Sequence, residues 1–113
     1  MGLELVGGAE VGVKTATIAV NTSTSSTLSI GGARRGTFQL PTAFTGANVA
    51  VQFSIDGSVF TAVPPMTWES NPQNVAANGT YSIPAKAFDA KFMQLVSGGT
   101  ENAARSIPVF FRA

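Results

Sequence analysis

Residues 53–60 read Phe-Ser-Ile-Asp-Gly-Ser-Val-Phe, with an Asp-Gly pair between two segments in which apolar and polar side chains alternate. An Asp-Gly pair in this setting is the strongest short-range sequence signal for a β-hairpin. If Asp56 and Gly57 form a two-residue turn, Phe53 lies directly opposite Phe60 on the neighbouring antiparallel strand. A three-residue loop with a bulge at Gly57 would instead shift the pairing by one residue and keep the burial without the direct contact between the rings. The sequence therefore predicts that both rings are buried on one side of a hairpin.

The segment before this turn alternates over seven residues. One face carries Val49, Val51, Phe53 and Ile55, and the other carries Ala50, Gln52 and Ser54. Because successive side chains of a strand point to opposite faces, the first set is expected to face the core. After the turn, residues 59–63 continue the sheet.

The rest of the chain repeats this pattern, with short alternating segments between clusters of Gly, Pro, Asn and Ser and no convincing amphipathic helix. Further strands are expected at residues 11–20, 27–30, 37–40, 81–83, 91–97 and 105–112. One helical turn is expected at residues 85–90. The pattern predicts an all-β protein, an antiparallel β-sandwich or jelly roll of seven to nine short strands.

Two of these strands carry more specific expectations. In the first, Val13, Ile18 and Val20 are candidates for burial. In the last, Ile107, Val109 and Phe111 share one face and are expected in the core. Pro108 lies on the opposite face and favours an edge position for this strand, because proline cannot donate a ladder hydrogen bond.

The length of 113 residues suits one domain. Residues 13–113 are expected to form the single β-sandwich. Residues 1–12 are small and flexible in character, with Leu3, Leu5 and Val6 among the large apolar groups of residues 2–12. This segment is interpreted either as an N-terminal arm that orders on a neighbouring molecule or as a frayed tail.

Composition argues against enzymatic chemistry. The chain has no His and no Cys, so the commonest general base, the usual zinc ligands and the thiolate nucleophile are absent. The six acidic residues are scattered along the sequence. We therefore expect a protein that is not an enzyme and that binds no cofactor or metal.

A net charge of +1 argues against a nucleic acid partner, and no apolar run approaches a membrane span.

Five residues are candidates for contact with a partner. Arg34 and Arg35 lie in a glycine-rich connection, where they are either a solvated pair or two guanidinium groups that bind acidic groups of a partner. Trp68 follows Pro64, Pro65 and Met66, and three interpretations stay open for it: a lid over the core, a subunit contact, or a ligand platform. Leu3 and Leu5 are the candidate contacts of the arm.

The order of segments between residues 38 and 112 resembles small virion structural proteins of tailed bacteriophages. The resemblance rests on Phe44-Thr-Gly, on Phe53-Ser-Ile-Asp-Gly, on Lys91-Phe-Met-Gln-Leu-Val-Ser-Gly, and on Ala103-Ala-Arg before the last strand. It implies a capsid decoration or cement protein that bridges capsid subunits and stabilises the shell. The implied partners are the major capsid protein or other virion subunits and further copies of itself. The implied location is the capsid surface, after synthesis in the host cytoplasm.

A second resemblance rests on residues 54–60 and 91–95, which are similar to core strands of discoidin-like jelly rolls. It implies a carbohydrate-binding module on a phage tail or surface protein. Both resemblances imply a β-sandwich, and a shared fold does not decide between the two functions.

Overall fold

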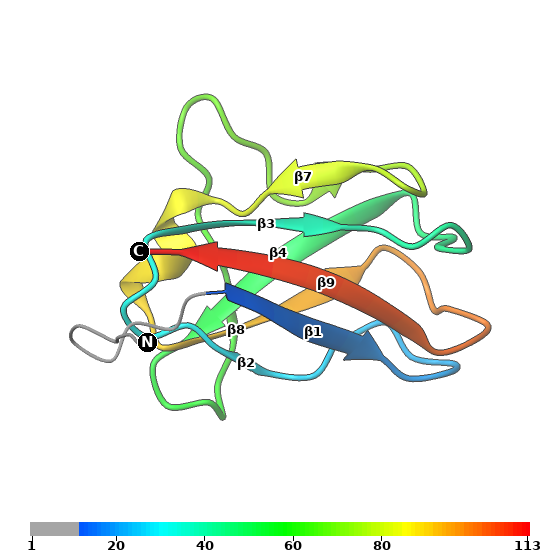
Figure 1. The fold of residues 1–113 in the computed structure, drawn as a ribbon, viewed down its shortest axis with the longest axis horizontal. Coiled ribbons are helices and arrows are strands. Elements are labelled where there is room, and N and C mark those ends of the chain that lie inside the picture. Colours follow the sequence, from blue (N-terminus) through cyan, green and yellow to red (C-terminus); the bar gives the residue numbers. More distant parts are fainter. Residues whose placement is uncertain (1–11) are drawn as a thin grey trace.

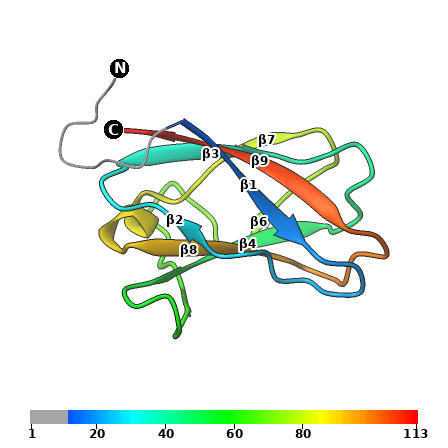
Figure 2. The same ribbon diagram turned by 60° about the horizontal axis from the view of Figure 1, so that its bottom comes forward.

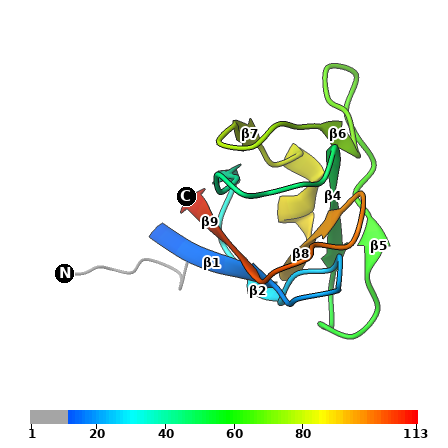
Figure 3. The same ribbon diagram turned by 90° about the vertical axis from the view of Figure 1, so that its right-hand side faces the viewer.

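Two antiparallel sheets stack face to face in the computed structural model, which describes residues 12–113 (Figure 1). The first sheet has the strand order β1 (Gly12–Ile18), β9 (Arg105–Arg112), β3 (Arg35–Gln39) and β7 (Thr80–Ser82). The second has the order β2 (Leu28–Ser29), β8 (Phe92–Ser97), β4 (Asn48–Ser54) and β5 (Thr61–Ala62), with β6 (Gln73–Asn74) also paired to β4. Figures 2 and 3 show the two layers from other directions. The predicted all-β sandwich is confirmed, with nine strands.

The core lies between the layers and follows from the alternation of side chains along inner strands of both sheets. Ile107, Val109 and Phe111 of β9 are buried, as predicted from their shared face. From the other sheet, Met93 and Leu95 of β8 are fully buried within the same hydrophobic cluster. At one end of the sandwich, the predicted helical turn is a 3-10 helix, η2 (Ala85–Asp89), which contributes Ala87 to this cluster.

The burial predicted for the first strand is correct for Ile18 and wrong for Val13 and Val20. In β1 the even-numbered side chains face the core, so Ala16 and Ile18 are buried while Val13 is 61% exposed on the outer face. Val20 is exposed because it lies beyond the end of the strand at Ile18. The predicted arm falls on residues outside the described range, except for Gly12, which begins β1.

The edge position expected from Pro108 is also wrong, because β9 lies between β1 and β3. The register explains how proline is accommodated. β3 pairs with residues 109–112 of β9, so the pairing stops at Val109 and does not include Pro108. Pro108 is therefore opposite Thr15 of β1 on one side and beyond the paired residues of β3 on the other.

The hairpin of β4 and β5 exists, but its register differs by one residue from that of a two-residue turn. Phe53 pairs with Thr61, and not with Phe60. Both rings are half-buried, and Phe53 packs against the core. Ile55 is 77% exposed, against the prediction, because β4 ends at Ser54.

Hydrogen bonds within the connection explain this longer loop. The Asp56 Oδ1 accepts from the backbone N–H groups of Ser58 at 2.8 Å and Val59 at 3.1 Å, and from the Ser54 hydroxyl at 3.0 Å. The Ser54 oxygen in turn accepts from the Gly57 N–H at 2.9 Å. These donors, the Ser58 N–H first among them, lower the pKa of Asp56. The carboxylate therefore stabilises a wider loop than an ideal Asp-Gly turn.

Gly57 has a φ of +79°, a left-handed conformation that side chains with a Cβ adopt at a cost. We expect Gly57→Ala to lower the free energy of unfolding by about 1 kcal/mol. Gly31→Ala is the matched control, because a Cβ there meets no atom within 4 Å. Urea unfolding of both variants tests this, and equal stability of the two would contradict the strain argument.

Candidate partner-binding surface

Three exposed arginines lie together at one end of the first sheet. Arg35, the first residue of β3, is the cross-strand partner of Arg112 in β9. The Arg34 N–H donates to the Arg112 carbonyl oxygen at 2.8 Å. The two strands are antiparallel, so β3 begins where β9 ends, beside the C-terminus in Figure 1. Segments more than 70 residues apart in sequence thus bring three arginine residues to the same end of one sheet.

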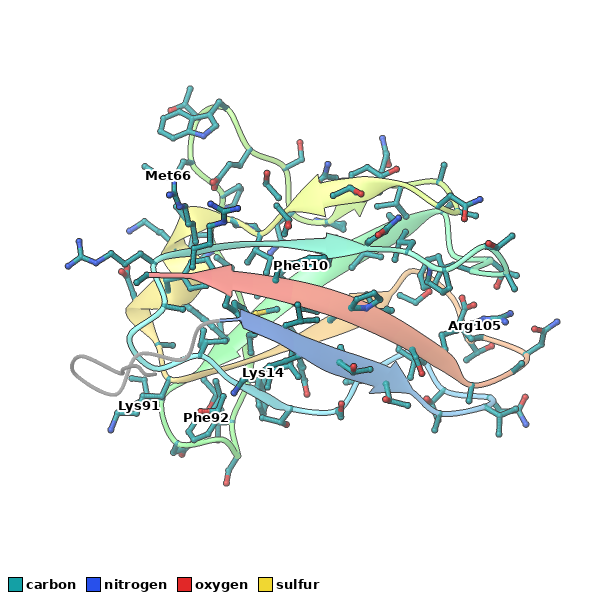
Figure 4. The ribbon with its side chains drawn as sticks, in the orientation of Figure 1. Lys14, Met66, Lys91, Phe92, Arg105 and Phe110 are labelled. Carbon is teal, nitrogen blue, oxygen red and sulfur yellow. The ribbon has the colours of Figure 1, made fainter. Side chains whose placement is uncertain are left out.

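These arginines have no carboxylate partner within residues 12–113. The one ion pair in that range joins Arg105 to Glu101, and Figure 4 places Arg105 at the opposite end of the sandwich. Glu69 and Asp56 are engaged as well, since their oxygens accept hydrogen bonds from backbone N–H groups. Like charges opposite each other on paired strands destabilise a sheet. The positive charges of the three arginines are therefore not balanced by an ion pair with any of residues 12–113.

An apolar row borders the arginines on the outer face of the same sheet. Phe110 of β9 pairs with Val13 of β1 on one side and with Thr37 of β3 on the other. Phe110 is 41% exposed, and Figure 4 shows it on the central strand of this sheet. A groove of about 610 Å³ is lined by Val13, Phe110, Arg35 and Arg112 among others. We call this set, together with Arg34, the arginine surface.

The predicted pair Arg34 and Arg35 is thus brought together with a third arginine. One detail of the prediction needs correction, because Arg35 belongs to β3 and not to a flexible connection. Its backbone is held by pairing with β9.

Trp68 lies apart from the arginine surface and is 76% exposed. The interpretation of this residue as a lid over the core is therefore wrong. It lines a second groove, of about 620 Å³, between its own loop and β7. The two grooves share Ser82 in their linings. Leu3 and Leu5 lie outside the described residues.

Sequence reasoning missed three members of the arginine surface: Val13, Phe110 and Arg112. A signal for the last two was present, because the buried set of β9 is odd-numbered and the even-numbered residues must face outward. What alternation does not reveal is that β3 is the neighbour of β9, since the two strands are far apart in sequence.

The described residues hold no group of three or more His, Cys, Asp or Glu side chains able to bind a metal ion. In the same range, no helix is long and apolar enough to cross a membrane. Comparison of the chain with protein-family models, with curated proteins and with solved structures finds no significant match.

Proposed function

We propose that this protein is a non-enzymatic structural protein of a tailed-phage virion, of the capsid decoration or cement type, and that it attaches through the arginine surface. The observation that carries the proposal is the clustering of Arg34, Arg35 and Arg112 with no carboxylate partner among residues 12–113. The sequence resemblance over residues 38–112 supports the choice of protein class.

The chemistry of arginine indicates the kind of partner. A guanidinium group presents several N–H donors in a planar fork that matches a carboxylate, so paired arginines favour an acidic protein surface. Complementary charge accelerates encounter and fixes orientation more than it adds affinity. Val13 and Phe110 beside the arginines supply apolar area that an interface core requires.

Attachment of this kind stabilises a shell by mass action. A domain that contacts two adjacent capsid subunits binds the assembled shell and not the separated subunits, so occupancy shifts the equilibrium toward assembly. Several copies arranged on the symmetry axes of the shell are the expected form.

The test is co-sedimentation with purified particles of the phage that encodes the chain, from which the native protein has been stripped. We expect Arg34→Ala combined with Arg35→Ala to weaken binding about tenfold at low salt, and less as salt rises and screens the charges. Occupancy equal to that of the wild type at every salt concentration would overturn the role of this surface.

Two further double variants separate the mechanisms. Lys86→Ala with Lys91→Ala removes the same charge from two exposed lysines that lie outside the arginine surface, so it controls for net charge and is expected to bind normally. Arg34→Lys with Arg35→Lys retains charge but loses the planar fork. Binding by the lysine form indicates steering by charge alone, whereas its loss indicates bidentate recognition.

A further inference from the structure

Trp68 is held out to solvent by a loop that is anchored on both sides. Between Val63 and Asn71 the chain leaves the second sheet, and Trp68 lies in the middle of this excursion. Figure 1 shows this part of the chain projecting past the end of β7, and Figure 4 places Met66, two residues before Trp68, in the same projection. Tryptophan is enriched at interaction sites relative to the rest of a protein surface.

Asn71 anchors the foot of the loop to the sheet. Its Oδ1 accepts from the Val51 N–H at 2.8 Å, and its Nδ2 donates to the carbonyl oxygens of Val51 at 2.9 Å and Val63 at 2.8 Å. The Asn71 side chain thus takes the place of one paired backbone residue at this point, because it bonds both the N–H and the carbonyl oxygen of Val51.

Glu69 anchors the other side. Its Oε1 accepts from the Met66 N–H at 2.9 Å, and its Oε2 accepts from the Ala85 N–H, at the start of η2, at 3.0 Å. The Glu69 N–H also donates to the Met66 carbonyl at 2.9 Å. Trp68 therefore lies inside a closed turn whose ends are fixed, so little conformational freedom remains to be lost when a ligand binds.

The groove beside Trp68 is polar and free of cations. Its volume of about 620 Å³ is in the range of small-ligand sites. Besides Trp68 itself, the polar lining side chains that make no hydrogen bond within residues 12–113 are Ser70, Gln73, Asn74, Thr80 and Ser82. The lining contains one carboxylate, that of Glu69, and both of its oxygens already accept hydrogen bonds.

We propose that this groove is a binding site for a neutral saccharide. A pyranose ring has an apolar C–H face and a rim of hydroxyl groups, which are complementary to an indole beside amide and hydroxyl side chains. The lack of Lys and Arg in the lining excludes selection of sulfated or carboxylated sugars at this site. The proposal is independent of particle attachment, because no residue of the arginine surface lines this groove and the two grooves share only Ser82.

The experiment uses the full chain and the emission of Trp68, which is its single tryptophan. The probes are cellohexaose, chitohexaose, xylohexaose and mannohexaose, with a heparin hexasaccharide as the anionic comparison. We expect at least one neutral probe to shift the emission to shorter wavelength and to show saturable binding by calorimetry, and the heparin probe to leave the emission unchanged.

Variants locate the site. Trp68→Ala is expected to weaken calorimetric binding about tenfold or more, and Trp68→Phe, which keeps an aromatic face, is expected to retain part of it. Gln73→Ala with Asn74→Ala keeps the fluorophore and is expected to weaken the emission response. Ile55→Ala is the matched control, since Ile55 is as exposed as Trp68 and lies on another loop.

Two results would overturn the proposal: no response to any neutral probe, or binding that Trp68→Ala leaves unchanged. The outcome is separable from the proposed virion role. Trp68→Ala should bind phage particles normally, and the double Arg34→Ala, Arg35→Ala variant should bind the saccharide normally.

Discussion

Replacing Glu101 by Gln is expected to lower the free energy of unfolding by about 3–5 kcal/mol. Glu101 is fully buried, and its Oε1 accepts from the Arg105 Nε at 2.8 Å and from the Thr45 N–H at 3.1 Å. Its Oε2 accepts from the Thr45 hydroxyl at 3.0 Å. The amide cannot neutralise Arg105, which is itself buried, and an uncompensated buried charge is costly. Urea unfolding at neutral pH measures the loss.

The same residue predicts an acid-sensitive fold. Burial of the Glu101 carboxyl raises its pKa, but hydrogen bonds from Arg105, Thr45 and Ser97 outweigh burial, and the pKa lies below its ordinary value of 4.5. A group whose pKa is lowered by folding stabilises the protein above the pKa of the unfolded chain, and this contribution is lost as pH falls through the folded value. The wild type should therefore lose stability below about pH 4.5 more steeply than Glu101→Gln.

Asp89→Asn serves as the control, because Asp89 is exposed and makes no ion pair or side-chain hydrogen bond with any of residues 12–113. It is expected to unfold like the wild type at neutral pH. A Glu101→Gln variant as stable as the wild type, with an unchanged pH profile, would show that the Glu101–Arg105 pair contributes nothing to the fold.

Phe38→Ala is expected to cost about 3–5 kcal/mol, within the range for large-to-small changes at fully buried aromatic positions. Phe38 is buried in β3, opposite Val109 of β9 and with its ring centroid 5.8 Å from that of Tyr81. Removing the ring leaves a cavity between the two sheets, because the paired backbones of β7 and β9 prevent collapse.

Phe53→Ala is the comparison, and its cost should be about 2 kcal/mol because Phe53 is half-buried and part of its surface is already in water. Chemical denaturation of the two variants in parallel gives the difference. Equal losses would mean that Phe53 carries as much of the core as Phe38, against the burial that the structure gives them.

The candidate sites divide between what local pattern reveals and what it does not. The sequence alone indicated Arg34, Arg35 and Trp68 as candidate contacts, because their side-chain types and flanking residues can be read locally. The third arginine, Arg112, became their neighbour only through the pairing of β3 with β9. The anchors of the Trp68 loop, Asn71 and Glu69, were not identified from the sequence, because Val51 on β4 and Ala85 at η2 are distant in sequence and only the Glu69 contacts with Met66 are local.

By itself, the sequence determined the strand content and the class of the fold, because alternation of side chains between two faces is a local property of each segment. It also placed β9 and its buried face correctly. Tertiary structure alone decided which strands are neighbours, as for Pro108 in a central strand. It also decided the register of the hairpin, which is shifted by one residue from that of a two-residue turn. The Asp56 hydrogen bonds stabilise a longer loop than the Asp-Gly pair predicts. Strand order and register depend on contacts between distant segments, which no single window of sequence contains.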